Sequence, residues 1–216
     1  MKRIPIICLA LFFCASLTAQ QVAEYKNSYI WGHSNRNTSS KGSALSAKTG
    51  DTYSLQNVVR KADSKDIDIL CFYGKFGKNQ PSFYLLAPLT PGLDVVWEKK
   101  GGTRPYSAFE GPKSDVDGPA HLKNWKTRNA TKLKKVAAED YDRADEASIA
   151  AIKFDETYMI PVQAGDVVAF ETAETSSIAG KKGLIKIVGI EDDMDKPENA
   201  GNGQYQKLNL RIKVLK

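Results

Sequence analysis

The sequence predicts a mainly β protein, an antiparallel β-sandwich with one short helix and a long central loop. Short segments with alternating apolar and polar residues recur along the chain, separated by turn residues, and only one interval has helical character. The 216 residues, 42% hydrophobic and 26% charged, are typical of a globular protein and not of collagen, a disulfide-rich miniprotein or a disordered chain. We expect a signal peptide at residues 1–19, a flexible N-terminal segment at 20–50 and one β-sandwich domain at 51–216.

The first 19 residues have the order of features found in a secretory signal peptide. Lys2 and Arg3 precede an apolar run over residues 6–15, and small residues follow the run. The run is shorter than the ~20 apolar residues that span a bilayer, and no other stretch is long enough for a transmembrane segment. We expect an exported chain beginning at Gln20 or Gln21, located in the periplasm, at the cell surface or outside the cell.

Cleavage leaves Cys71 as the one cysteine, because Cys8 and Cys14 lie in the signal peptide. A single cysteine forms no internal disulfide, so the exported chain depends on its hydrophobic core. Lipidation of Cys14 is the alternative fate, although Phe13 stands where such sites normally have a small residue. Loss of Lys2 and Arg3 lowers the net charge from +6 to +4, an excess too diffuse to indicate a nucleic-acid partner.

Residues 20–50 are polar and rich in small side chains, which favours a flexible segment. The strands expected after it are Thr52–Val59, Asp66–Tyr73, Ser82–Ala87 and a shorter run, Leu93–Glu98. In the second strand, alternation places four residues on one face: Ile67, Ile69, Cys71 and Tyr73.

The segment Lys99–Lys123 is rich in glycine and proline and lacks apolar periodicity, so it is predicted to be the long central loop. The next segment, Trp125–Val136, alternates again and places four cationic residues on one face: Lys126, Arg128, Lys132 and Lys134. Such a face indicates a solvated strand whose charge discourages pairing with another edge.

The helix is expected near Asp142–Phe154, capped by Asp142 or Asp145, with Tyr141, Ile149 and Ile152 buried. Four strands follow, at Tyr158–Gln163, Asp166–Thr172, Gly183–Ile190 and Gln206–Lys216. In the last strand, apolar side chains occupy one face, as in a sandwich strand whose other face is exposed to solvent: Leu208, Leu210, Ile212 and Val214.

Three segments carry a resemblance to known proteins: Asp66–Gly74 (DIDILCFYG), Ala164–Thr172 (AGDVVAFET) and Lys182–Ile190 (KGLIKIVGI). Followed by a final alternating strand, they resemble uncharacterised secreted or surface β-sandwich domains of Bacteroidota. A more distant likeness is to the HmuY-type haem-scavenging proteins, which implies a similar layout of strand pairs. That likeness does not identify any haem-ligating residue in this chain, because no local motif of the family surrounds either histidine, His33 or His121.

Common catalytic constellations are missing from the sequence. A Ser–His–Asp or Cys–His site would depend on His33 or His121, and no G-x-S-x-G elbow is present. Cys71 shares a strand face with apolar residues, which favours a buried, inert thiol. Asp66 and Asp68 point to the same side of their strand, but nothing identifies an acid and a base. No zinc cluster, P-loop or dinucleotide fingerprint occurs, so we expect no cofactor.

Two groups of residues are candidates for binding. In the central loop, Tyr106 and Phe109 have turn-forming neighbours that expose aromatic faces, and His121 lies at the loop's end. Weaker candidates for Ca²⁺ are Asp192, Asp193 and Asp195, which lack the glycine and the spacing of an EF-hand and are more typical of a solvated hairpin loop.

The sequence therefore favours an exported, non-enzymatic binding or interaction module whose partner is a glycan, another small molecule or a surface protein. The alternative is a carboxylate-based hydrolase acting on an extracellular polymer. The two hypotheses differ in whether two Asp or Glu side chains meet in a concave pocket of the fold.

Overall fold

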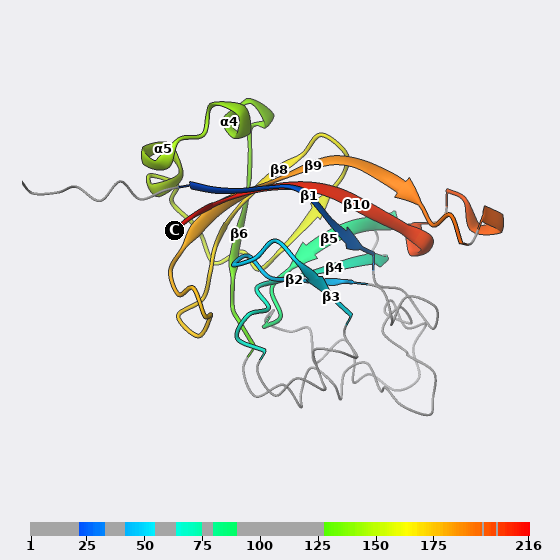
Figure 1. Cartoon of the computed structure of the whole chain (residues 1–216), viewed down its shortest axis with the longest axis horizontal. Coiled ribbons are helices and arrows are strands. Elements are labelled where there is room, and N and C mark those ends of the chain that lie inside the picture. Colours follow the sequence, from blue (N-terminus) through cyan, green and yellow to red (C-terminus); the bar gives the residue numbers. More distant parts are fainter. Residues whose placement is uncertain are drawn as a thin grey trace, which may run out of the picture.

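The computed structural model describes residues 22–32, 42–54, 64–74, 80–89, 128–195, 197–201 and 203–216. Within these ranges the chain forms two antiparallel five-stranded sheets that pack face to face, which confirms the predicted β-sandwich (Figure 1). The expected signal peptide, the expected strand Leu93–Glu98 and the predicted central loop lie outside the described residues. No helix of the described ranges has the length and apolar character needed to cross a membrane.

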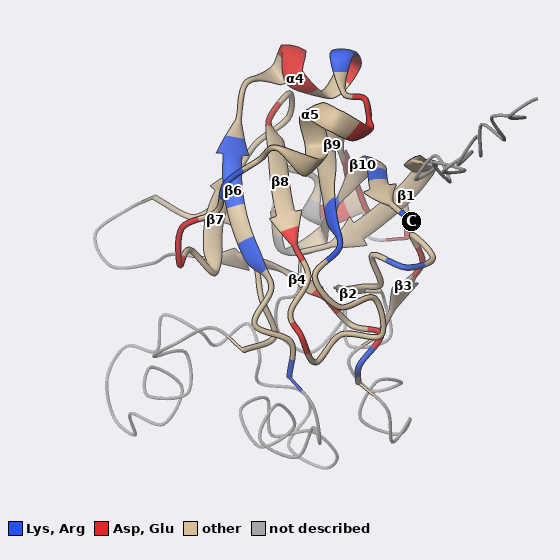
Figure 2. Cartoon of the chain, turned by 90° about the vertical axis from the view of Figure 1, so that its left-hand side faces the viewer, with Lys and Arg blue, Asp and Glu red and all other residues tan. Residues whose placement is uncertain are grey.

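The first sheet has the strand order β1-β10-β9-β8-β6. Its members are β1 (Val22–Trp31), β10 (Gln206–Leu215), β9 (Lys182–Asp192), β8 (Val167–Glu171) and β6 (Lys132–Val136). The cationic strand β6 is at the edge of the sheet, as its lysines predict, and Figure 2 shows its positive charge. Lysine side chains on an edge strand oppose pairing with another chain.

The second sheet has the order β3-β2-β4-β5-β7. Its members are β3 (Thr52–Tyr53), β2 (Ala44–Leu45), β4 (Ile69–Gly74), β5 (Ser82–Leu86) and β7 (Met159–Val162). Strand β4 is buried on both faces, because Leu70 and Phe72 are as inaccessible as Ile69 and Cys71. The run ILCFY is accordingly almost continuous in apolar character, unlike the alternating strand β10.

The main core lies between the two sheets. Strand β10 contributes the apolar face predicted from its alternation, and β4 contributes Ile69 and Cys71, with Tyr73 packed against the same cluster. The buried residues of the β10 face are Leu208, Leu210, Ile212 and Val214.

Two short helices replace the single helix expected near Asp142–Phe154: α4 (Ala138–Arg143) and α5 (Glu146–Ala150). The chain is extended at Ala144, which ends α4, and Asp145 then caps α5 by accepting a 2.8 Å hydrogen bond from the Ser148 amide. Both helices pack on the outer face of the first sheet through Tyr141 and Ile149, as expected of these two residues (Figure 1).

Parts of residues 20–50, which were expected to form a flexible segment, are in regular strands. Strand β1 pairs with β10 along most of its length, and Ala44–Leu45 forms β2. A register shift between Tyr25 and Ser28 breaks the alternation of β1, so its polar sequence does not read as a strand with one apolar face.

Strands β9 and β10 are joined by a connection that forms one end of the molecule (Figure 1). It contains two short 3-10 helices, η2 (Pro197–Asn199) and η3 (Gly203–Tyr205). The helices α4 and α5 lie over the opposite half of the first sheet (Figure 1).

Candidate functional sites

The Asp68 carboxylate is completely buried just before strand β4. Its Oδ2 accepts a 3.0 Å hydrogen bond from the Ala47 amide, and its Oδ1 accepts bonds from Asn129 Nδ2 at 3.2 Å and Ser176 Oγ at 2.6 Å. These donors come from three other segments of the chain, so one carboxylate joins four segments. Buried carboxylates require such partners because they have lost their hydration.

Asn129 extends this network in two directions. Its Nδ2 also donates to the carbonyl oxygens of Lys65 and Ile67, at 2.9 and 2.7 Å, and its Oδ1 accepts a 2.9 Å hydrogen bond from Thr175 Oγ1. We call Asp68, Asn129, Thr175 and Ser176 the Asp68 cluster. It connects the segment that precedes β4, the segment that precedes β6, and the connection between β8 and β9.

Burial is the largest influence on the acidity of Asp68. It raises the pKa of this carboxyl from 3.8 to about 6, and the nearby Asp66 charge also raises it, while the hydrogen bonds from Ser176, Ala47 and Asn129 lower it. A group with such a pKa changes its charge near neutral pH. Because it has no exposed surface, it meets no external substrate in this conformation.

The neighbouring Asp66 is in a different environment. Its side chain is 49% exposed, its Oδ1 lies 3.7 Å from the Lys48 ammonium, and it accepts a hydrogen bond from the Ser177 hydroxyl. Hydrolysis of a glycosidic bond needs two carboxyl groups that both face the substrate. The Asp66–Asp68 pair, with one buried member, does not provide them.

The weak calcium candidates lie at the β9–β10 connection. Asp192 Oδ1 accepts hydrogen bonds of 2.8 Å from the Gly201 amide and from Gln206 Nε2, and Asp193 Oδ1 accepts one of 3.1 Å from the Asp195 amide. These are contacts that shape a turn. Among the described residues, no three His, Cys, Asp or Glu side chains are arranged to hold a metal ion, so the calcium alternative gains no support.

Cys71 is a buried free thiol in the main core, as predicted. Burial raises the pKa of this thiol well above its usual value. Since the thiolate is the nucleophile, Cys71 is not activated for catalysis.

The predicted ligand-binding residues Tyr106, Phe109 and His121 lie outside the described residues, as does His33. The loop site stays a prediction. A tenfold or greater loss of ligand binding when Tyr106 and Phe109 are both replaced by alanine, with an unchanged melting temperature, remains its test, since stacking contributes ~1 kcal/mol per ring.

A further surface was not predicted from the sequence. Five large hydrophobic side chains of the described residues are exposed, and four of them lie at the end of the first sheet that carries the β9–β10 connection. We call this surface the hairpin end. Its members, with their exposed fractions, are Tyr29 (45%), Val188 (51%), Ile190 (37%) and Met194 (88%).

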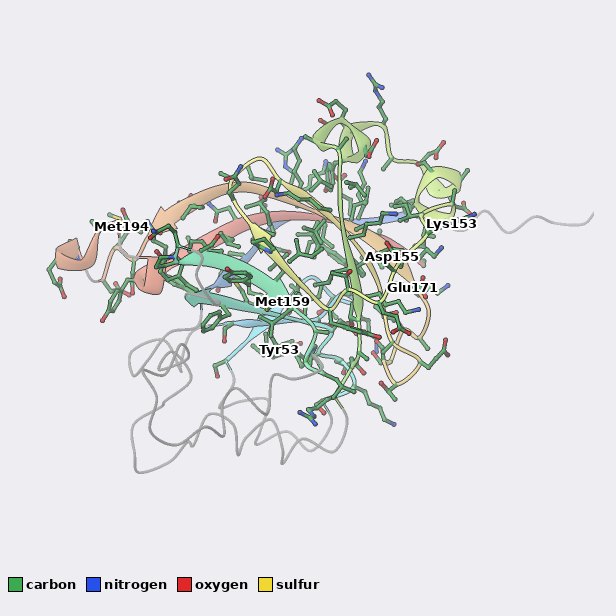
Figure 3. All side chains as sticks on the ribbon, turned by 180° about the vertical axis from the view of Figure 1, so that it is seen from behind. Tyr53, Lys153, Asp155, Met159, Glu171 and Met194 are labelled. Atoms are coloured by element: carbon green, nitrogen blue, oxygen red, sulfur yellow. The ribbon has the colours of Figure 1, made fainter. Side chains whose placement is uncertain are left out.

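Strand register places these residues in neighbouring rows at this end of the sheet. Tyr29 on β1 pairs with Asn209 on β10, which pairs with Gly189 on β9, and Val188 lies at the register shift beside Gly189. Ile190 pairs with the buried core residue Leu208, so its side chain is on the opposite face of the sheet from Tyr29. The ammonium of Lys207 lies 5.5 Å from the centre of the Tyr29 ring. Met194 follows the end of β9, and Figure 3 shows it at the extremity of the molecule, far from Lys153.

Polar contacts lie beside Tyr29 at the hairpin end. Lys207 forms a 3.0 Å ion pair with Glu191, and Glu191 also accepts a 2.5 Å hydrogen bond from Asn209 Nδ2. Both bonds hold the pKa of Glu191 below its usual range, with the Lys207 hydrogen bond as the larger cause. An apolar surface with a polar margin is typical of a site that binds another macromolecule.

Comparison of the chain with protein-family models, with curated proteins and with solved structures gives no match.

Proposed function

We propose that this protein is an exported, non-enzymatic interaction module that binds its partner through the hairpin end. The supporting observation is that four of the five exposed large hydrophobic side chains of the described residues gather at one end of one sheet. Single exposed apolar residues are common on soluble proteins, whereas a group of them usually indicates a binding surface.

The construction of the hairpin end supports the same proposal. The surface lies on hydrogen-bonded strands, where Tyr29, Val188 and Ile190 belong to paired or bulged positions of β1 and β9. A surface held by a sheet changes little on binding, so less conformational entropy is lost when a partner docks.

Among the described residues, the pair Asp66 and Asp68 gives no support to the hydrolase alternative. The buried carboxylate of Asp68 is occupied by three internal donors, and its neighbour Asp66 contacts Lys48 and Ser177. With the thiol of Cys71 also buried, these groups serve the packing of the sandwich.

Export is the second part of the proposal, and it rests on the signal-peptide features of residues 1–19. Mass spectrometry of the protein isolated from its own cells should show a chain that begins at Gln20 or Gln21. An intact Met1, or a diacylated Cys14, would contradict cleavage at this position.

Site-specific photo-crosslinking in the native cells tests the binding surface. A photoreactive residue at position 194 should give one dominant adduct, because Met194 is almost fully exposed at the extremity of the hairpin. The same residue at position 153, at the other end of the molecule, is the matched control (Figure 3). Equal adducts from both positions, or none from position 194, would contradict the proposed surface.

A further inference from the structure

The connection between β9 and β10 is acidic, although the protein as a whole is basic. Residues 191–198 contain five acidic side chains and one lysine, whereas the whole chain has a formal net charge of +6. The acidic residues are Glu191, Asp192, Asp193, Asp195 and Glu198. Asp193 is buried, whereas Glu191, Asp195 and Glu198 are exposed and Asp192 is partly exposed, so most of this negative charge is at the surface of the hairpin end.

Part of this charge is not neutralised by the contacts of the hairpin. Glu191 is paired with the Lys207 ammonium at 3.0 Å. Asp192, in contrast, accepts hydrogen bonds from two neutral groups, the Gly201 backbone amide and the Gln206 side-chain amide. Hydrogen bonds from amides stabilise a carboxylate without cancelling its charge. Asp192 accordingly keeps a negative charge at the margin of the apolar surface.

Met194 is presented by an ordered turn. The Asp193 amide donates a 2.7 Å hydrogen bond to the Tyr205 carbonyl, and the Asp195 amide donates to the Asp193 side chain at 3.1 Å. Both neighbours of Met194 are thus bonded within the hairpin, while its own side chain is 88% exposed. A methionine side chain is flexible and polarizable, so it fits irregular apolar pockets.

We propose that the hairpin end binds a protein whose surface is cationic and has a small apolar pocket that accepts Met194. The inference deepens the proposed function and depends on it, since it assigns a partner to the same surface. Charge complementarity selects this partner, because an acidic margin attracts Lys and Arg side chains and repels acidic surfaces.

The same charges argue against two other occupants. An anionic membrane would be repelled by the acidic margin as Met194 approached it. A second copy docking in the same way would bring two acidic hairpins together across a two-fold axis, where like charges face each other.

Peptide binding by fluorescence anisotropy tests the charge of the partner. The probes are a labelled peptide of alternating Lys and Leu, and two versions in which every Lys is replaced by Gln or by Glu. The protein should bind the Lys peptide most tightly, and its affinity should fall about tenfold between 20 and 200 mM NaCl, because salt screens exposed charges. Vesicles of phosphatidylglycerol serve as the membrane probe and should not bind.

Two variants locate the binding. Met194→Ser should weaken binding of the Lys peptide about tenfold, because burial of one large apolar side chain is lost. Glu198→Lys should weaken it about fivefold through charge, and Glu198→Gln by less. Leu89→Ser and Glu156→Lys are the matched controls, because they make the same kinds of change at exposed positions outside the hairpin end. All variants should keep the melting temperature of the unmodified chain.

The outcomes separate this inference from the proposed function. If the Gln and Lys peptides bind equally and Met194→Ser weakens both, the hairpin end is a binding surface and the cationic partner is wrong. If the vesicles bind and Met194→Ser abolishes their binding, the partner is a membrane and the inference fails. If no peptide binds, or the controls weaken binding as much as the hairpin variants do, the inference is overturned, and position-194 crosslinking alone decides the proposed function.

Discussion

The Ser176 hydroxyl donates a 2.6 Å hydrogen bond to Oδ1 of Asp68 across 108 positions of sequence. Ser176 lies between β8 and β9 of the first sheet, and Asp68 directly precedes β4 of the second. The bond therefore joins the two sheets at a point where both partners are buried. Burial makes the contact important, since a carboxylate in the interior has no water to replace a lost donor.

Replacing Ser176 with alanine should lower the free energy of unfolding by about 2 kcal/mol, because Asp68 would lose one of its three donors while remaining buried. Urea denaturation followed by tryptophan fluorescence measures the change. Ser177→Ala is the matched control: it removes a hydroxyl from the next residue, whose partner Asp66 is half exposed, and should cost less than about 0.5 kcal/mol. Equal losses from the two variants would mean that the Asp68 cluster is not a special contact.

Stability should depend on the charge of Asp68 in the direction set by its raised pKa. The folded value of about 6 exceeds the ordinary 3.8, so the folded state holds the proton more tightly than the unfolded state. The stabilisation from this group is present in full below about pH 4 and is lost as pH rises through 6. The loss should be on the order of 2–3 kcal/mol.

Comparison with Asp68→Asn isolates this effect from the titration of other carboxylates. The difference in unfolding free energy between the original chain and Asp68→Asn should shift in favour of Asp68→Asn as pH increases from 4.5 to 7.5. Urea denaturation at half-unit intervals measures it. A difference that is independent of pH would show that Asp68 has an ordinary pKa in the folded protein.

The strands that could be predicted from the sequence are those with one face in the core and the other face less buried. In β10, Leu208, Leu210 and Ile212 face the core while the residues between them are less buried, so alternation identifies the strand. Strand β1 could not be predicted in this way, because the irregularity between Tyr25 and Ser28 shifts the register of its inward-facing residues.

The geometry of the candidate sites depends on contacts between segments that are far apart in the sequence. The spacing of Asp66 and Asp68 indicates that they share a side of the strand, but their difference in burial comes from partners such as Asn129 and Ser176, which are 61 and 108 positions from Asp68. The exposure of Met194 likewise follows from the turn that the Tyr205 carbonyl closes, and an acidic run in the sequence does not reveal it.

Lysine side chains should be important for attaching the helices. Lys213 on β10 donates to the Tyr141 carbonyl at 2.8 Å and the Ala144 carbonyl at 3.3 Å, and its ammonium lies 4.9 Å from the centre of the Tyr141 ring. Lys213→Met keeps the apolar stem but removes the ammonium donor from both carbonyls, leaving that of Tyr141 with the 3.3 Å bond from the Ala144 amide, and should cost about 1–2 kcal/mol.

Hydrogen exchange of the α4 amides and urea denaturation measure this effect. Exchange should accelerate in α4 more than in the strands of the main core. Lys132→Met is the control on the same sheet, because its ion pair with Glu171 is 3.9 Å long and partly exposed, and it should cost less than about 0.5 kcal/mol. Unchanged protection of α4 in Lys213→Met would contradict the proposed attachment.

Two glycines of strand β9 should respond in opposite ways to alanine. A Cβ at Gly183 would lie 2.4 Å from the Lys213 carbonyl oxygen and 2.4 Å from the Phe170 ring, whereas a Cβ at Gly189 would have no atom within 4 Å. Neither glycine has a positive φ, so backbone strain does not distinguish them. Gly183→Ala should therefore destabilise the protein by about 2–3 kcal/mol through crowding between β10 and β8. Gly189→Ala should stabilise it by about 0.5 kcal/mol, because alanine loses less conformational entropy than glycine on folding. Thermal unfolding of both variants measures the contrast, and a similar loss from each would mean that the close packing at Gly183 relaxes without cost.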